Sequence, residues 1–381
     1  MEADKLKRSN LYYVFIGVTI LLGVILLVNI ALTFSLNKEL KKSAEAVQEK
    51  LKPAKIELTL IKNSKCNDCF DISALISHIK NANVNVTNEK AMEFDSKEGR
   101  EIISKYKIEK VPTVVVTGEI EKASIQGLEK RENALLLTNV PPPYTSALAG
   151  KIEGRVTLYI LMDLGCTKCN ELSILISQIK GAGVKIYEEK NIDAESDEGK
   201  ELSKKYNIDF VPTIVLSKDA SAYGIIQQAW PQIGSKESDG SYVLRAVNPP
   251  FINLTTGKLR GLVDIIYLTD KSCIDCYDVA QHREILTSPQ SFAIKLEKEE
   301  KIDISDAKGK ELISKYNLTQ VPTIILSSEV SAYPSNIALK QFFSVEKDGS
   351  YVFRRVSVVG TYKDLTTNQV VQAQQSPQEG Q

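Results

Sequence analysis

The sequence contains little histidine and carries no excess charge of either sign. Only two histidines occur in 381 residues, which argues against a histidine-rich metal site. Lys plus Arg and Asp plus Glu both number 48, so the formal net charge is zero. Nucleic-acid binding requires a basic surface that neutralises phosphates, and this balance argues against it. The chain also has no cysteine outside three Cys-x-x-Cys pairs, which fits an oxidising compartment.

The longest stretch without a charged residue lies near the N-terminus and includes residues 11–36. It predicts an uncleaved transmembrane anchor, because ~20 apolar residues span a bilayer core. A cleaved signal peptide is the alternative, but its apolar region covers only ~7–15 residues. Three basic residues stand close on each side, so charge alone does not orient the segment. We expect the short tail, residues 1–10, in the cytoplasm and the bulk of the chain outside.

Residues 37–53 are rich in Lys, Glu, Ala and Leu and end at Pro53. They predict a solvated helical stalk, which the proline terminates. This stretch has the composition of a spacer.

All six cysteines belong to three motifs, and each motif is followed at a nearly fixed distance by Val-Pro-Thr. The proline comes 46 residues after the first cysteine in two copies and 49 residues after it in the third. The three copies are Cys66–Cys69 with Val111-Pro112, Cys166–Cys169 with Val211-Pro212, and Cys273–Cys276 with Val321-Pro322.

The residues around each motif predict the same order of elements. A strand precedes the motif, as at 55–62 and 156–162, and an apolar stripe with helical spacing follows it. A second helix ends at Lys-Tyr, six residues before the proline, and a strand follows Val-Pro. Asp239-Gly240 and Asp348-Gly349 predict hairpin turns. Such units of ~100 residues are α/β domains rather than solenoid repeats.

We therefore predict an α/β fold with three tandem domains, at residues 54–150, 151–257 and 258–371. The pairs Pro142-Pro143 and Pro249-Pro250 are interpreted as short linkers. The tail at 372–381 is rich in Gln, Ser and Pro and is predicted to be disordered.

A Cys-x-x-Cys that begins a helix places two thiols on one turn. The helix N-terminus favours an anion, which lowers the pKa of the first thiol and makes it a better nucleophile at neutral pH. The second cysteine can then resolve the mixed disulfide. The predicted nucleophiles are Cys66, Cys166 and Cys273, and the predicted resolving thiols are Cys69, Cys169 and Cys276.

Two other interpretations of the cysteine pairs remain open. A structural disulfide across four residues would restrict the unfolded chain by only about 2 kcal/mol. A zinc site requires two such pairs, or a pair with histidines, close together. The pairs here belong to separate domains about 100 residues apart, so we expect neither a metal nor a cofactor.

Each unit has a strand, then Cys-x-x-Cys, then Lys-Tyr-x-[Ile/Leu]-x-x-Val-Pro-Thr and a further strand. In this order of motifs the unit resembles a thioredoxin-fold domain. The resemblance covers roughly residues 55–365, three times over. It implies a thiol–disulfide oxidoreductase fold in which the prolines of Val-Pro-Thr are cis and pack against the dithiol. The valines and prolines would then help to bind an extended substrate. Those implied substrate-binding residues are Val111, Pro112, Val211, Pro212, Val321 and Pro322.

The sequence departs from thioredoxin at several positions. Lys65, Gly165 and Ser272 replace the tryptophan before the first cysteine. The buried acidic residue that would accept the proton of the resolving thiol is replaced by Leu60, Ile160 and Tyr267.

The residues inside the motifs predict a ranking of the thiols. Asp68 and Asp275 place a negative charge beside their thiols and disfavour the thiolate, whereas Lys168 favours it. Cys166 is therefore predicted to have the lowest pKa of the three nucleophiles.

The two histidines are not predicted to act in catalysis. His78 falls on the solvated face of its helix. His282 stands where the other two repeats carry leucine, so we expect it to pack at the edge of the core.

The sequence thus predicts a membrane-anchored thiol–disulfide oxidoreductase or isomerase that acts outside the cytoplasm. Its expected partners are protein disulfides or dithiols, a separate redox partner, and the lipid bilayer around residues 11–36, with no nucleic acid. The alternative is a tethered binding or chaperone-like module in which some or all dithiols do not turn over.

Overall fold

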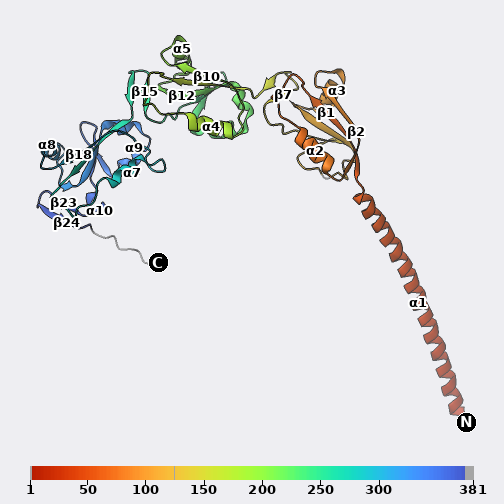
Figure 1. Cartoon of the computed structure of the whole chain (residues 1–381). Coiled ribbons are helices and arrows are strands. Elements are labelled where there is room, and N and C mark those ends of the chain that lie inside the picture. The colour runs from red at the N-terminus through yellow and green to blue at the C-terminus, as the bar shows by residue number, and fades with distance from the viewer. Residues whose placement is uncertain (1, 124, 374–381) are drawn as a thin grey trace. The chain divides into compact units, whose positions relative to one another are not determined.

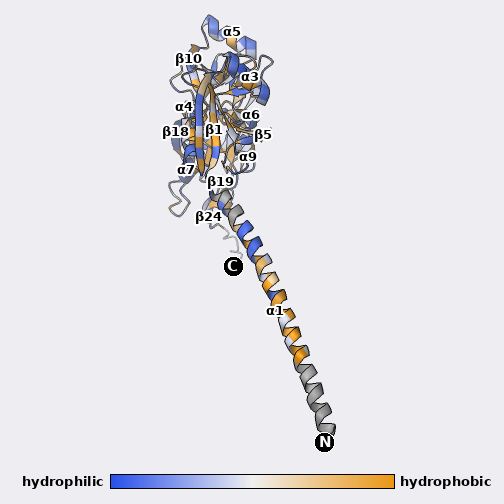
Figure 2. Ribbon diagram, turned by 90° about the vertical axis from the view of Figure 1, so that its right-hand side faces the viewer, coloured by the Kyte–Doolittle hydropathy of each residue, from blue (hydrophilic) through white to orange (hydrophobic). Residues whose placement is uncertain are grey.

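The computed structural model describes residues 2–123 and 125–373. They begin with one continuous helix, α1 (Glu2–Leu51) (Figure 1). Ile16–Ala44 within it is long and apolar enough to cross a membrane, and its most apolar window buries no residue against the protein. Figure 2 shows these apolar residues along α1. A signal sequence near an N-terminus would have the same properties. The predicted anchor and stalk therefore belong to a single helix.

The described residues after α1 include three five-stranded mixed sheets of the same topology. In the first, the spatial order is β2-β1-β4-β6-β5. β1 pairs in parallel with β2 and antiparallel with β4, so the strand that leads to the first dithiol is an interior strand of the sheet. The strands are β1 (Ala54–Lys62), β2 (Val84–Glu93), β4 (Thr113–Gly118), β5 (Glu129–Arg131) and β6 (Ala134–Leu136).

The second and third sheets repeat this arrangement, in the orders β10-β9-β12-β14-β13 and β18-β17-β20-β22-β21. The chain divides into two compact units, of which one ends at Ile152 and the other, holding both of these sheets, begins at Glu153. The strands are β9 (Val156–Met162), β10 (Ile186–Asp193), β12 (Thr213–Leu216), β13 (Gly234–Lys236), β14 (Tyr242–Leu244), β17 (Leu262–Thr269), β18 (Lys295–Asp303), β20 (Thr323–Leu326), β21 (Phe343–Val345) and β22 (Tyr351–Phe353).

Two helices accompany each sheet, and the helix after the dithiol packs its predicted apolar stripe against the sheet. In the first domain Ile72 and Ile79 lie in the same core cluster as Ile56 and Val114 of the sheet. The helices after the dithiols are α2 (Ser73–Asn81), α4 (Ser173–Gly181) and α7 (Gln281–Thr287); those before Val-Pro are α3 (Lys97–Tyr106), α5 (Asp197–Tyr206) and α8 (Ala307–Tyr316).

The second and third domains carry additional short helices before the last hairpin of the sheet. These are η1 (Lys218–Ala222), α6 (Gly224–Ala229), η2 (Trp230–Gln232), η3 (Ser328–Ala332), α9 (Asn336–Leu339) and, beyond the sheet, α10 (Val356–Val359).

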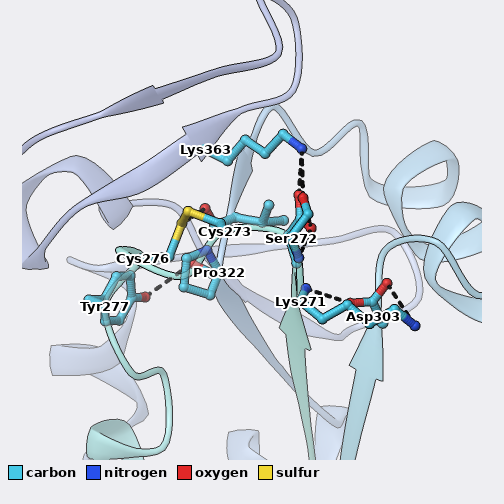
Figure 3. The surroundings of a disulfide bond; sticks show 10 residues. Lys271, Ser272, Cys273, Cys276, Tyr277, Asp303, Pro322 and Lys363 are labelled. Atoms are coloured by element: carbon cyan, nitrogen blue, oxygen red, sulfur yellow. Dashed lines mark hydrogen bonds and ion pairs between the residues drawn. A yellow bond between two sulfur atoms is a disulfide. The ribbon is translucent and has the colours of Figure 1, made fainter.

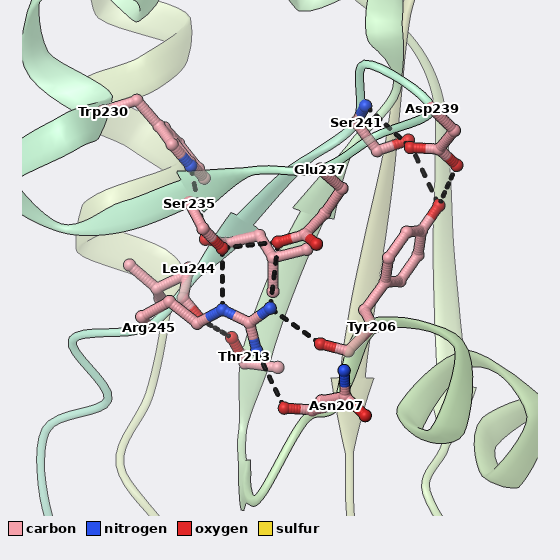
Figure 4. Close-up of polar contacts among 11 residues, drawn as sticks. Tyr206, Asn207, Thr213, Trp230, Ser235, Glu237, Asp239, Ser241, Leu244 and Arg245 are labelled. Atoms are coloured by element: carbon pink, nitrogen blue, oxygen red, sulfur yellow. Dashed lines mark hydrogen bonds and ion pairs between the residues drawn. The ribbon is translucent and has the colours of Figure 1, made fainter.

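The repeated Lys-Tyr ends each of the second helices, as predicted, and the contacts show why it recurs (Figure 4). The hydroxyl of Tyr206 bonds to Asp239 and Ser241 in the predicted hairpin turn. The Arg245 guanidinium donates to the carbonyls of Tyr206 and Asn207, which are left without a helical partner at the helix end. The motif therefore ties the end of α5 to the β13–β14 hairpin and has a structural role.

Each domain also has a small three-stranded sheet that the sequence did not predict. The residue pair that ends at the valine of Val-Pro forms a short strand, and a hairpin from the end of the domain pairs with it. We call the hairpins β7–β8, β15–β16 and β23–β24 the flanking hairpins. The three small sheets are β3 (Lys110–Val111) with β7 (Tyr144–Ser146) and β8 (Ile152–Glu153), β11 (Phe210–Val211) with β15 (Phe251–Asn253) and β16 (Lys258–Arg260), and β19 (Gln320–Val321) with β23 (Tyr362–Asp364) and β24 (Gln369–Val371).

The segments after the two proline pairs, interpreted from sequence as linkers, are thus paired strands. Strands of two or three residues are too short to show a period of two, and their partners lie more than thirty residues away. The tail, from residue 374 on, lies outside the described residues.

Candidate functional site

The structure joins each predicted pair of cysteines in a disulfide bond. The S–S distance is 2.06 Å for Cys66–Cys69, 2.07 Å for Cys166–Cys169 and 2.04 Å for Cys273–Cys276. The peptide bonds before Pro112, Pro212 and Pro322 are all cis, as the resemblance implied.

The dithiols do not begin a helix, and this prediction was wrong. α2 begins at Ser73 and α4 at Ser173, each four positions after the second cysteine, and α7 begins at Gln281, five positions after it. The residue after the second cysteine instead donates its backbone N–H to the chain just before the flanking hairpin, as Phe70 does to Pro143. Since the helix dipole acts only within about one turn of the helix end, it does not stabilise a thiolate at the first cysteine.

Dithiol and proline turn lie side by side within a domain. In the second domain Cys166, Cys169 and Pro212 line one cleft of about 520 Å³ that runs along α4. In the third domain Cys276 Sγ lies 3.9 Å from the carbonyl oxygen of Val321. The structure therefore brings together residues that are more than forty positions apart in sequence.

The flanking hairpin occupies the position where the sequence predicted that a substrate would pair. Val111 faces Thr145, Val211 faces Ile252, and Val321 faces Lys363 in antiparallel ladders. All three valines are fully buried.

The dithiols differ in exposure. Cys66 and Cys273 are each only 9% exposed, whereas Cys166 is half-buried. The second cysteine of every pair is half-buried. Among the three predicted nucleophiles, Cys166 is therefore the most accessible to another molecule.

The charges near the first and second dithiols also differ. Asp68 Oδ1 lies 3.6 Å from Cys66 Sγ. Lys168 stands at the matching position of the second motif and forms an ion pair with Glu297, so part of its positive charge is compensated. The predicted ranking of thiol pKa values remains a prediction.

A buried ion pair adjoins the third dithiol (Figure 3). Lys363 Nζ lies 2.6 Å from Asp270 Oδ2, and Ser272 donates to Asp270 Oδ1. Burial acts to raise the pKa of the Asp270 carboxyl, but hydrogen bonds from Lys363 and Ser272 outweigh it and hold that pKa below its usual value.

His282 packs in the core, as predicted. It is 8% exposed, its ring lies 4.6 Å from that of Phe353, and burial lowers its pKa. The Tyr277 hydroxyl donates to the carbonyl of Pro322, so His282 Nε2 must donate to the Tyr277 oxygen 3.3 Å away. His282 thus supports the proline turn through Tyr277. His78 is exposed.

Apolar or aromatic residues occupy the positions where the resemblance would place a buried acidic residue. Ile160 and Tyr267 are buried, and Tyr267 bonds through its hydroxyl to Glu299. Among the described residues, no group of three or more His, Cys, Asp or Glu side chains is arranged to hold a metal ion.

The residues that sequence reasoning missed are those of the flanking hairpins that face the valines: Thr145, Ile252 and Lys363. Their signal in the sequence is weak. Each follows a paired proline or a Gly-Thr by only a few residues, and the three side chains share no chemistry.

No protein-family model and no curated protein matches the sequence. Solved structures that match include the N-terminal (NTD_N/C) domain of alkylhydroperoxide reductase AhpF from Enterococcus faecalis, with 15% identity over 47% of this chain and 89% of that chain and a TM-score of 0.16. Human ERp44 matches with 13% identity over 78% of this chain and 88% of that one, with a TM-score of 0.13. ERdj5 matches with 11% identity over 74% of this chain and 39% of that one, with a TM-score of 0.14. The strand order and the proline turns described above, rather than these likenesses, define the fold.

Proposed function

We propose that this chain, which consists of three thioredoxin-like domains behind an N-terminal apolar helix, is a membrane-tethered thiol–disulfide oxidoreductase. It exchanges disulfides with protein substrates outside the cytoplasm through its three dithiols. Cys66, Cys166 and Cys273 act as nucleophiles, and Cys69, Cys169 and Cys276 as resolving thiols.

The second domain carries this proposal. Its half-buried Cys166 shares an open cleft with Cys169 and Pro212, so a substrate disulfide has room to reach a sulfur atom beside the proline turn. A disulfide with a purely structural role needs no such access.

The reaction is a two-electron exchange. The Cys166 thiolate attacks a substrate disulfide, forms a mixed disulfide and releases one substrate thiolate. Cys169 then attacks Cys166, closes the internal disulfide and releases the second substrate thiol. Two electrons and two protons pass from the dithiol to the substrate, and the reverse sequence oxidises a substrate dithiol. An isomerisation results instead when a different thiolate of the substrate attacks the mixed disulfide, because this forms a new substrate disulfide and releases the Cys166 thiolate.

Trapping of the mixed disulfide tests the proposal. Cys169→Ser should accumulate covalent adducts of the full chain with client proteins through Cys166, and thiol reductant should release them. Cys69→Ser and Cys276→Ser test the other two domains in the same way. The matched control is the double variant Cys166→Ser/Cys169→Ser, which retains the other two dithiols. If none of the three single variants accumulates adducts above its double-variant control, the tethered binding module is the better description.

The membrane tether is tested separately. An uncleaved anchor predicts that the mature protein retains residues 11–36 and stays in the membrane fraction at high salt. Its domains should be digested by protease added outside intact cells. A mature N-terminus beyond residue 36 would identify a signal sequence instead.

A further inference from the structure

The flanking hairpins cover the backbone groups that a substrate would need. We propose that each hairpin is a gate that must leave the Val-Pro turn before a protein substrate can pair there. The residue that faces the valine, which is Thr145, Ile252 or Lys363, sets how easily the gate opens. The inference rests on the proposed function and concerns the regulation of the same site.

The first step is that the hairpins use the hydrogen-bonding groups of the valines. Ala147 N–H donates to the carbonyl of Glu109. Hydrogen-bonded and non-bonded pairs alternate along an antiparallel ladder, so Val111 and Thr145, two positions along, form a bonded pair. The same holds in the other domains, where Leu254 donates to Asp209 and Leu365 donates to Thr319. An extended substrate cannot pair with the valine until the hairpin leaves it.

The second step is that each hairpin is also fastened on the other side of its dithiol. The residue after the second cysteine donates its backbone N–H to the chain just before the hairpin: Phe70 to Pro143, Asn170 to Pro250 and Tyr277 to Thr361. The disulfide thus lies between two points of attachment, and opening the hairpin exposes sulfur and valine together.

The third step is that the attachments differ in strength, and the third domain has the strongest. Lys363 donates to Asp270, whose side chain is 4% exposed, while that of Lys363 is 15% exposed. Asp270 in turn accepts the backbone N–H and the hydroxyl of Ser272. Opening this hairpin would leave a buried carboxylate without its cation, which is strongly unfavourable.

The first domain has a weaker attachment of the same kind. Asn63, which is three residues before Cys66 as Asp270 is before Cys273, donates to the Thr145 hydroxyl at 3.0 Å. This bond joins two neutral groups, and such bonds are about half as strong as charge-assisted ones.

The second domain has no polar attachment through the facing residue, because Ile252 is a hydrocarbon side chain. Asp163 stands at the position of Asp270, where it accepts the backbone N–H of Gly165. Opening should therefore be easiest in the second domain, intermediate in the first and hardest in the third. The exposure of the first cysteine separates the second domain from the other two in the same sense, because Cys166 is half-buried whereas Cys66 and Cys273 are both 9% exposed.

The test compares a small and an extended thiol on the full chain. In three variants that each retain one dithiol, with the other four cysteines changed to serine, the retained disulfide is reduced by mercaptoethanol and by a short extended peptide with one central cysteine. The ratio of peptide rate to mercaptoethanol rate measures the gate, because only the peptide needs the valine. We expect the ratio to be highest for the second domain and lowest for the third.

Reciprocal exchange of the facing residues makes the test specific. Lys363→Ile should raise the ratio in the third domain, and Ile252→Lys, which places an ammonium opposite Asp163, should lower it in the second, each by about tenfold, the change that 1.4 kcal/mol produces. The matched control is Lys271→Ile, which removes an exposed ammonium paired with Asp303 near the same disulfide and away from the hairpin. It should leave the ratio unchanged.

Equal ratios in the three domains, or exchanges that leave the ratio unchanged, would overturn the gate. Hydrogen exchange of the β20 amides shows whether Lys363→Ile remains folded; if it does not, Ile252→Lys alone decides. The trapping experiment uses separate variants. A gate without clients gives the predicted ratios and no adducts, whereas an ungated enzyme gives adducts and equal ratios.

Discussion

The contact between Asp68 and the first dithiol gives a quantitative prediction. The Asp68 carboxylate lies 3.6 Å from Cys66 Sγ and is exposed to solvent. Two unit charges about 4 Å apart in water interact by about 1 kcal/mol. Since 1.36 kcal/mol corresponds to one pKa unit, Asp68→Asn should lower the pKa of the reduced Cys66 thiol by somewhat less than about 1 unit.

The same change should shift the reduction potential. Above the thiol pKa, stabilising the thiolate stabilises the reduced form, and a tenfold change in the equilibrium constant corresponds to about 30 mV for a two-electron couple. Asp68→Asn should therefore raise the potential of the first dithiol by up to about 30 mV and make it a weaker reductant.

The assay uses the chain that retains only the first dithiol. Thiolate absorbance against pH gives the pKa of Cys66, and equilibration with glutathione gives the potential. Asp71→Asn is the matched control, because it removes an equal charge from an exposed carboxylate that bonds to Ser73 rather than approaching the sulfur. An unchanged or higher pKa in Asp68→Asn, or an equal fall in Asp71→Asn, would refute the electrostatic argument.

Three further predictions concern stability. Burial lowers the pKa of His282, so the unfolded chain binds more protons just below pH ~6.5, the ordinary value. The free energy of unfolding of the third domain should therefore fall as pH drops through that window, and His282→Leu should flatten this slope in hydrogen exchange of β20. Gly199→Ala should destabilise the second domain by about 1–3 kcal/mol in chemical denaturation, because its Cβ would lie 2.0 Å from the carbonyl oxygen of Asp193; Gly181→Ala, which has nothing within 4 Å, should not. Arg245→Ala should cost about 1–3 kcal/mol and speed hydrogen exchange at the end of α5, whereas slow exchange there would show that water replaces the guanidinium.

Local pattern determined much of this protein. The apolar run at 156–162 is β9, the helical stripe buries Ile79, and the predicted helix ends at Tyr206 hold in the structure. These features depend on contacts within one element or on one buried face, so spacing along the chain is enough to reveal them. The three-fold repetition made even the weak tripeptide Val-Pro-Thr informative.

Only the tertiary structure decided what surrounds the dithiols. The sequence suggested a helix that starts at the first cysteine, yet α2 begins only at Ser73, and Phe70 between them donates its backbone N–H to Pro143, just before the flanking hairpin. The pairing of Val111 with Thr145 joins two- and three-residue strands across 34 positions, and neither strand is long enough to show a period. The ion pair of Lys363 with Asp270 spans 93 positions. Contacts of this kind depend on which segments the fold brings together, and no local pattern of residues encodes that choice.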